Sequence, residues 1–280
     1  MTFRIGPRTS QIIAYIFLLT LTVIAVFILI FIIAFIFKNG FSQLTIGFLT
    51  QKTHEMGKEG GILPSIIGTL LVSFLAIIIA TPLGVGSAIY LSEYTKAGPI
   101  RRLISFGADC LAGVPSILFG LFGFIFFVTI LKLGWCIFSG GLTLALMILP
   151  TIIRTSEEAI KAVPKSYREI SYSLGGGKLD TILKVTLPTA IPGILTGVVL
   201  GIGRAVGETA ATIFTTGASL NIPTSIFSSS RTLAVHFYML AREGISMPKA
   251  YGTATVLIIL ILVINFVAYR LMHRFMARYY

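Results

Sequence analysis

The chain has 280 residues, of which 55% are apolar and only 11% are Asp, Glu, Lys or Arg. A soluble domain carries roughly 25% charged residues, so this composition excludes an ordinary soluble enzyme, a nucleic-acid-binding protein and a disordered chain. A formal charge of +12 in so apolar a chain points to the loops of a membrane protein. Two cysteines and three histidines form neither a disulfide framework nor a recognisable metal-ligand spacing, and we expect no cofactor.

Six apolar runs are long enough to cross a bilayer, because a spanning helix needs about 20 mostly apolar residues. In chain order they are Ile12–Phe37, Ile66–Leu91, Leu111–Leu131, Trp135–Ile153, Ile191–Phe214 and Thr253–Tyr269. The first run is too long for a cleaved signal peptide and predicts a retained signal-anchor helix. The runs lack the alternation of a β-barrel, so the predicted fold class is an all-α integral membrane protein with six transmembrane helices.

The basic residues fix the orientation of these helices. With the N-terminus inside, 14 of the 22 Lys and Arg residues fall on the cytoplasmic side, seven fall outside, and Arg204 lies within the membrane. This excess follows the positive-inside rule and predicts that both termini are cytoplasmic. Cys110 and Cys136 would then lie near opposite faces of the membrane, as free thiols.

Two polar segments are predicted to lie outside. Residues 38–64 form an outer loop, and residues 1–64 look separable by composition from the main domain, residues 65–275. Residues 215–250 form the second outer segment, in which the apolar stretch around residues 233–240 predicts a short helix at the membrane interface.

The longest inner segment, residues 154–190, carries 10 of the 32 formal charges, and a simple connector between helices is usually 2–8 residues long. Its pattern predicts one amphipathic helix ending at Gly175–Gly177 and a second running from Leu179 to Leu187, before Pro188. One interpretation is a hairpin that only packs on lipid headgroups. The other is a docking element for a partner.

The spacing in this segment resembles the EAA loop of binding-protein-dependent ABC importer permeases, which reads Glu-Ala-Ala, three residues, Gly, nine residues, Ile-x-Leu-Pro. The matching positions are Glu169, Ile170 and Ser171, then Gly175, then Val185, Thr186, Leu187 and Pro188. The spacing is kept throughout, with Ile, Ser and Val replacing the two alanines and the isoleucine. Further stretches, Gly113–Gly120, Ile152–Ala159 and Arg204–Ala210, are similar to the phosphate-specific members of that family.

The resemblance implies a type I importer permease fold (MetI-like) in the cytoplasmic membrane of a bacterium or archaeon. It implies that residues 154–190 form a coupling helix that docks in a cleft of a separate ATPase subunit. It also implies the partners: a homologous permease subunit, a dimer of ATPase subunits and an extracytoplasmic phosphate-binding protein. The chain itself would be a non-catalytic permease that imports phosphate by alternating access.

Arg204 and Glu208 are predicted to lie inside the membrane, where charged side chains are costly and usually functional. On one helix they would share a face and form an i,i+4 contact. One interpretation is a self-neutralising pair that holds a helix interface. The other is that Arg204 lines the anion path, since guanidinium suits phosphate oxygens, with Glu208 holding it in place and Thr209 adding a hydroxyl.

Other classes fit the sequence less well. Gly175–Lys178 lacks the leading Gly and the following Ser or Thr of a phosphate-binding loop, so the chain cannot hydrolyse ATP by that motif. An ion-coupled secondary transporter usually shows internal repeats and several buried carboxylates, and only Glu208 is predicted well inside the bilayer. A membrane-embedded enzyme would need catalytic groups that this sequence does not provide. The alternatives that stay open are a permease for another oxyanion and, less favoured, a secondary transporter.

Overall fold

The computed structural model describes residues 7–95 and 98–276, and most of them are helical. The helices are α1 (Pro7–Gly40), α2 (Ile46–Thr50), α3 (Leu63–Ile89), α4 (Pro99–Gly113), α5 (Ser116–Gly123), α6 (Ile137–Ala162), α7 (Lys165–Ser173), α8 (Lys178–Thr181), α9 (Leu187–Val206), α10 (Ala210–Thr215), α11 (Leu233–Arg242) and α12 (Met247–Met276). Strands β1 (Thr53–His54) and β2 (Glu59–Gly60) pair antiparallel. Three π-helical segments, Tyr90–Tyr94, Phe124–Ile130 and Ile182–Thr186, extend α3, α5 and α8.

Five helices are long and apolar enough to cross a membrane, and a sixth crossing is present if one bent pair counts as a single span. That pair, Arg101–Gly113 with Ser116–Ile130, bends by 100°, so the helix predicted over Leu111–Leu131 is broken near its start. The bend falls at Val114, which is extended because the following Pro115 disfavours helical backbone before it. The segment preceding the predicted span is helical as well, as α4.

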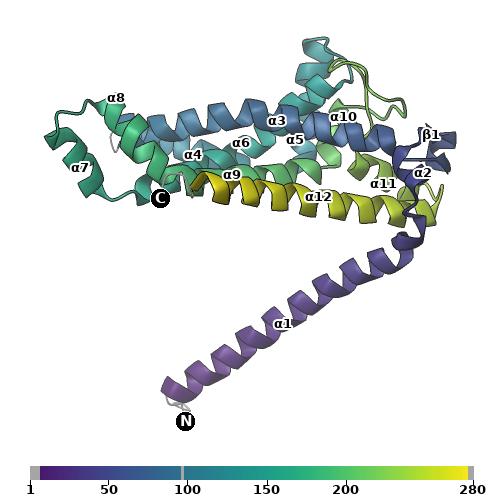
Figure 1. Ribbon diagram of the computed structural model, residues 1–280, viewed down its shortest axis with the longest axis horizontal. Helices are drawn as coiled ribbons and strands as arrows, with labels where there is room; N and C mark the ends of the chain where they lie inside the picture. Colours follow the sequence, from purple (N-terminus) through teal and green to yellow (C-terminus); the bar gives the residue numbers. More distant parts are fainter. Residues whose placement is uncertain (1–6, 96–97, 277–280) are drawn as a thin grey trace.

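Helices α3, α6, α9 and α12 run side by side along the long axis of the molecule (Figure 1). The main apolar core lies between α3, α6 and α9. A side chain at Gly84 of α3 would strike Ile152 of α6, and one at Gly197 of α9 would strike Thr155. Small residues at such contacts let membrane helices approach closely, which explains their place in this bundle.

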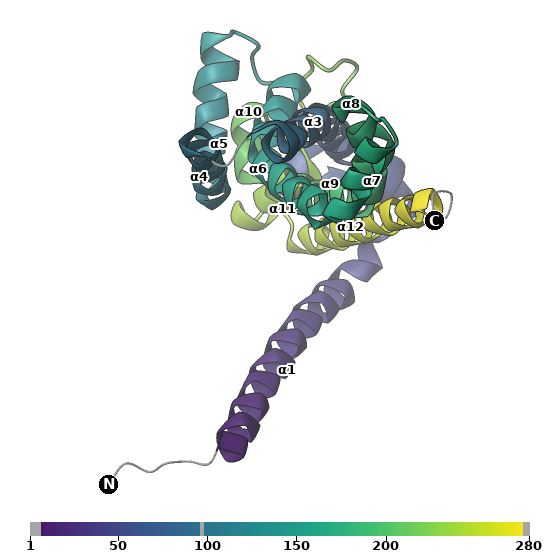
Figure 2. The ribbon, with the colours of Figure 1, turned by 90° about the vertical axis from the view of Figure 1, so that its left-hand side faces the viewer.

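Helix α1 leaves the bundle at the end that carries α2 and β1, and runs away from it on a diagonal (Figures 1 and 2). Its C-terminal end packs on α12: the Phe35 and Tyr251 rings meet edge to face at 5.8 Å, and Thr255 Oγ1 donates to the Ile36 carbonyl at 3.4 Å. The rest of α1 presents apolar side chains on every face, as expected of a helix surrounded by lipid. The described part of the chain excludes residues 1–6, 96–97 and 277–280. Three of the basic residues predicted to be cytoplasmic fall there: Arg4, Lys96 and Arg278.

Segment 215–250, predicted to lie outside, contains the expected short helix, α11, but not at the surface. Leu233, Val235 and Leu240 are fully buried against neighbouring helices, so the prediction of an interfacial helix is wrong. The Leu233 amide donates to Thr69 Oγ1 of α3 at 2.8 Å, and Thr232 caps the helix. Its apolar side chains therefore join the core at the end of the bundle that carries α2 and β1. From sequence, a hydrophobic stretch of this length could lie either in such a core or at the membrane interface.

Candidate functional site

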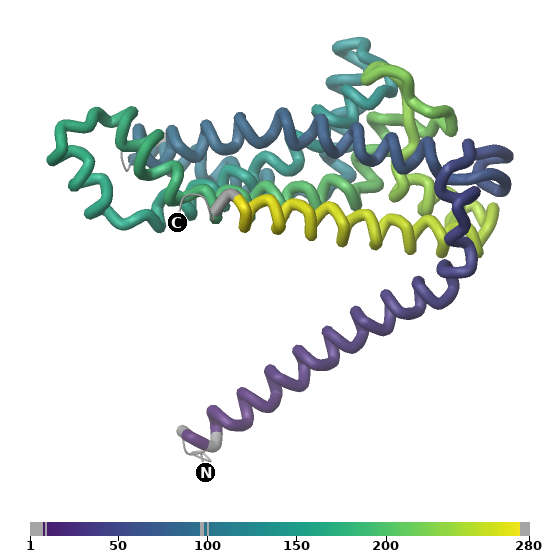
Figure 3. The backbone as a smooth tube through the Cα atoms, viewed as in Figure 1, coloured from purple at the N-terminus to yellow at the C-terminus, as the bar shows by residue number. Residues whose placement is uncertain are grey.

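The segment 154–190 projects from the end of the bundle opposite α2 and β1, and Figure 3 traces it from α6 outward through α7 and α8 and back into α9. Gly175 makes the turn between its two limbs with φ of +83°, a left-handed conformation that glycine adopts without steric cost. Its amide donates to the Tyr172 carbonyl at 3.0 Å, and the Gly176 amide donates to the Ser171 carbonyl at 2.9 Å. The turn expected at Gly175 is therefore present.

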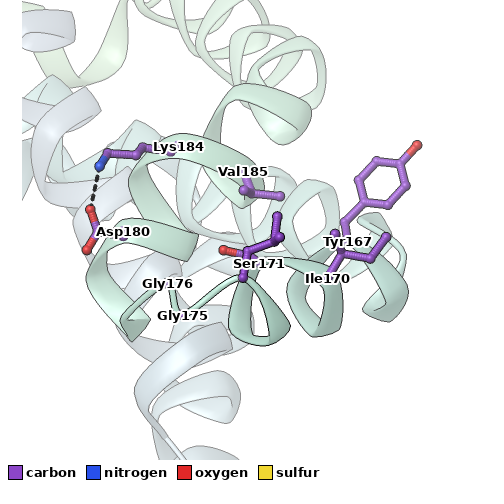
Figure 4. Close-up of a pocket in the computed structure, with 9 residues that line it drawn as sticks. Tyr167, Ile170, Ser171, Gly175, Gly176, Asp180, Lys184 and Val185 are labelled. Atoms are coloured by element: carbon purple, nitrogen blue, oxygen red, sulfur yellow. Dashed lines mark ion pairs between the residues drawn. The ribbon is translucent and has the colours of Figure 1, made fainter.

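A shallow hollow of about 550 Å³ lies between the two limbs (Figure 4). Its lining comprises Tyr167, Ile170, Ser171, Leu174, Gly175, Gly176, Asp180, Lys184 and Val185. Ser171 Oγ lies 2.8 Å from Thr181 Oγ1 and ties the limbs together, and an Asp180–Lys184 ion pair of 2.6 Å forms part of the rim. Leu174 is 83% exposed, an unusual position for a large apolar side chain on a polar segment.

The structure brings Ser171, Gly175 and Val185 of the predicted docking pattern into this hollow. Glu169 is exposed on α7 outside it. Leu187 packs instead on the cluster formed by Ala88, Ile160, Val163, Ala190 and Ile194. Pro188 does not end a helix as predicted: it lies in the first turn of α9, directly after the π-helical segment, where a missing amide proton is tolerated.

The spanning helix that carries Arg204 ends earlier than predicted. Helix α9 stops at Val206 and α10 starts at Ala210, so the single helix expected over Ile191–Phe214 is broken at residues 207–209. Gly207 ends α9, and Glu208 Oε1 accepts the Ala211 amide at 3.2 Å, which caps α10. The expected i,i+4 contact is therefore absent: among the described residues no hydrogen bond or ion pair joins Arg204 to Glu208.

Arg204 lies in the last turn of α9 and is partly buried, and Thr209 lies at the start of α10. A cation at the C-terminal end of a helix interacts favourably with the helix dipole. The guanidinium thus lies at a break between two helices, and within the described part of the chain no hydrogen bond or ion pair engages it, whereas a carboxylate oxygen of Glu208 accepts the Ala211 amide of α10.

A network of charges between α4 and the C-terminal part of α6 was not expected from sequence. Glu157 is 1% exposed and lies 3.1 Å from Arg101 Nη2, 3.3 Å from Arg154 Nη1 and 2.6 Å from Lys161 Nζ. Arg154 Nε also donates to Asp109 Oδ1 at 2.8 Å. These contacts hold α4 against α6, and a buried carboxylate with several cationic partners is costly to disturb. The only sequence signal was the i,i+3 and i,i+4 spacing around Glu157.

A second unexpected group lies at the end of the bundle that carries α2 and β1. Arg231 is 3% exposed; its Nε donates to the Ala218 carbonyl at 3.1 Å, and its Nη1 lies 3.5 Å from His236 Nδ1. Burial, with the nearby charges of Arg231 and Lys249, lowers the pKa of His236 to about 3. His236 is therefore neutral at ordinary pH and accepts from Arg231, and the pair fixes the loop before α11.

A bundle of five apolar helices long enough to span a membrane, or six if the bent pair is one span, with a projecting loop between α6 and α9, is the architecture expected of a membrane permease. The comparisons identify the family. The model of the family described as "Binding-protein-dependent transport system inner membrane component" matches residues 80–279, and the chain belongs to this family. An alginate-importing bacterial ABC transporter structure matches with a TM-score of 0.68 at 17% identity, covering 95% of this chain and 96% of that one, which confirms the fold.

Two relatives are similar over most of their length. The chain is 34% identical over 257 residues to "Probable ABC transporter permease protein YqgI" of Bacillus subtilis, covering 86% of this chain and 87% of that protein. It is also 34% identical over 268 residues to "Phosphate transport system permease protein PstA 1" of Mycobacterium tuberculosis, covering 93% of this chain and 88% of that protein. The resemblance inferred from the loop spacing is thereby confirmed.

Proposed function

We propose that this chain is a PstA-type permease that forms half of the transmembrane pathway of an ATP-driven importer of inorganic phosphate. The observation that carries the proposal is Arg204, a permanently charged guanidinium at the break between α9 and α10 with no carboxylate bonded to it among the described residues. The similarity to phosphate permeases supports the choice of phosphate over another oxyanion. An anion moving through a low-dielectric bundle needs such a partner.

In this proposal Arg204 attracts and orients the anion by donating planar, paired hydrogen bonds to its oxygens. Thr209, three residues past the end of α9, adds a hydroxyl. Glu208 is anchored by the α10 amide, so it limits how tightly the anion is held without neutralising Arg204. Release then remains fast enough for transport.

The segment 154–190 is the docking element for the ATPase subunit, on the cytoplasmic side. The exposed apolar side chains Ile170, Leu174 and Leu179 support this role, because they lie on a charged segment where a surface exposed to water would be polar. Glu169, Ser171, Gly175 and Val185 form the docking face and its turn. Leu187 and Pro188 anchor it to α9.

The proposed assembly pairs this chain with a homologous PstC-type permease above a dimer of PstB-type ATPase subunits, and a PstS-type binding protein delivers phosphate from outside. Both termini are cytoplasmic. Residues 1–64, with the diverging α1, form a unit attached to the permease domain of residues 65–275. ATP binding closes the ATPase dimer, moves the docking segments together and opens the pathway outward; hydrolysis returns it inward.

Transport by the purified complex in proteoliposomes tests this function. With ATP inside, we expect uptake of labelled phosphate that stops when ATP is replaced by ADP, is insensitive to a proton ionophore and resists excess sulfate. Uptake that follows an imposed proton gradient without ATP would contradict the proposal in favour of a secondary carrier. Equal transport of sulfate would contradict the assignment of phosphate.

A further inference from the structure

Arg168 joins the docking segment, residues 154–190, to α3, a helix that neither precedes nor follows this segment directly in the chain. From α7, its guanidinium reaches Glu93 in the π-helical turn that ends α3, with Nε at 3.1 Å and Nη2 at 2.8 Å from Glu93 Oε1. The two side chains are only 17% and 9% exposed. A charge-assisted contact that is this well shielded is screened little by salt.

The same guanidinium also closes the end of α6. Its Nη1 donates to the Val163 carbonyl at 2.8 Å, and its Nη2 donates to the Ile160 carbonyl at 2.9 Å. All three nitrogens of the group are therefore engaged, in a fixed fork that lysine cannot reproduce. One side chain connects α7, the last turn of α6 and the end of α3.

The second limb of the docking segment touches the same turn. The Lys178 ammonium, at the start of α8, lies 4.4 Å from the centroid of the Tyr94 ring, next to Glu93 in the chain. Cation–π contacts of this kind are weaker than a shielded ion pair. Both limbs therefore contact the end of α3, and the ion pair of Arg168 is stronger than the cation–π contact of Lys178.

We propose that the Arg168–Glu93 contact is a strut that makes α3 move with the docking segment, so that its loss uncouples ATP hydrolysis from transport. The covalent chain joins the segment only to α6 and α9, so any push delivered to α3 must cross contacts between side chains. Arg168 is here a positioning residue, because it touches neither the anion nor the ATPase in this account. The inference rests on the proposed docking of residues 154–190 on an ATPase.

The test uses the complete importer in proteoliposomes and compares phosphate transported per ATP hydrolysed. In Glu93→Gln and Arg168→Gln, we expect normal assembly and ATP hydrolysis, with the ratio lowered about tenfold, the factor that corresponds to losing one charge-assisted hydrogen bond. Exchanging the two charges (Glu93→Arg with Arg168→Glu) should recover part of the ratio. Arg102→Gln is the matched control, because Arg102 is an exposed arginine on α4, outside the docking segment, and its loss should leave the ratio unchanged.

An unchanged ratio in both single variants would overturn the strut. Loss of assembly in Glu93→Gln and in the conservative Glu93→Asp would also overturn it, because the pair would then belong to the fold rather than to the coupling path. A crosslink from Ser171→Cys to the ATPase, measured in the same preparations, separates the two proposals. If the crosslink forms and the ratio is normal, only the strut fails; if no crosslink forms in the otherwise native chain, the docking proposal fails.

Discussion

Arg204 is the residue whose role can be tested most sharply, because the structure separates it from Glu208. Arg204→Met should lower phosphate uptake by about 10- to 100-fold, the range expected when hydrogen bonds to a charged group are lost. Assembly should be preserved, because the residue stands at a helix end with no bonded carboxylate among the described residues. Arg204→Lys keeps the charge without the planar fork and should retain partial uptake.

The comparison needs matched amounts of assembled complex and an arginine control away from the pathway. Arg242→Met suits this purpose, since Arg242 is exposed at the end of α11 and should leave uptake unchanged. The double variant Arg204→Met with Glu208→Gln should remain inactive. Near-normal uptake in that variant would refute the anion-path role and restore the interpretation of a self-neutralising pair.

Burial of His236 predicts that the stability of the chain depends on pH. Its pKa is about 3 in the folded chain against an ordinary value of 6.5, so between these values the unfolded chain binds more protons. Stability from this group is complete above pH 6.5 and falls as the pH is lowered, by at most about 1.4 kcal/mol per pH unit. Thermal unfolding in detergent at pH 7.5 and pH 5 measures it.

Glutamine at position 236 does not titrate, so His236→Gln should show a smaller loss of melting temperature between pH 7.5 and pH 5 than the native chain. An equal loss in the two proteins would show that His236 is protonated without cost. Arg231 and Lys249 are the charged groups that act on His236, and both are kept in the variant, so the comparison isolates the histidine.

The sequence indicated where the important charged residues lie more often than it indicated which residues they contact. Arg204 and Glu208 were predicted to share a helical face, but Gly207 ends the helix between them and turns Glu208 into a cap. Arg168 was counted only as a cytoplasmic charge. Its partner Glu93 is 75 residues away in the chain, a separation over which spacing rules say nothing.

Among the elements, the turn at Gly175 carries a distinct prediction. A Cβ there would meet nothing within 4 Å, so a substitution costs only the left-handed backbone conformation. That cost is roughly 1–2 kcal/mol, larger for β-branched residues and smallest for Asn. Gly175→Val should therefore distort the limbs and lower phosphate transported per ATP, whereas Gly175→Asn should be tolerated.

Gly177→Ala provides the control for this series, because Gly177 has φ of −73° and space for a methyl group. It should behave like the native chain in both hydrolysis and transport. Normal coupling in Gly175→Val, with the complex intact, would show that the tight turn is not needed for the docking segment to act.

The elements themselves were largely predictable, since apolar runs of about 20 residues leave few alternatives in a membrane. The prediction that each apolar run forms one continuous helix was wrong for two of them. Pro115 bends the third span, and Gly207 interrupts the fifth. Helix α11 was misplaced because its apolar residues fit an interface and a core equally well. In each case the deciding contact comes from another element, and a single run of residues does not contain it.

For the whole molecule, the sidedness of the charges and the spacing of one inner segment were enough to reach the family, because both are local properties of the chain. The exposed apolar side chains on that segment could not be anticipated, since exposure depends on how the limbs fold. The arrangement places the docking segment at one end of the bundle and α11 near the other, with α3, α6 and α9 between them (Figure 1). Arg204 lies on the last of these helices.

The most direct test of the account is a site-specific crosslink from Ser171→Cys, placed in the hollow between the two limbs. Exposed Cys110 is replaced by Ser and buried Cys136 is kept. If the segment docks on the ATPase from the cytoplasmic side, we expect a crosslink to the ATPase subunit whose yield changes when ATP is added. We expect no reaction with an impermeant thiol reagent added outside intact cells. Labelling from outside, or no crosslink in an assembled complex, would contradict it.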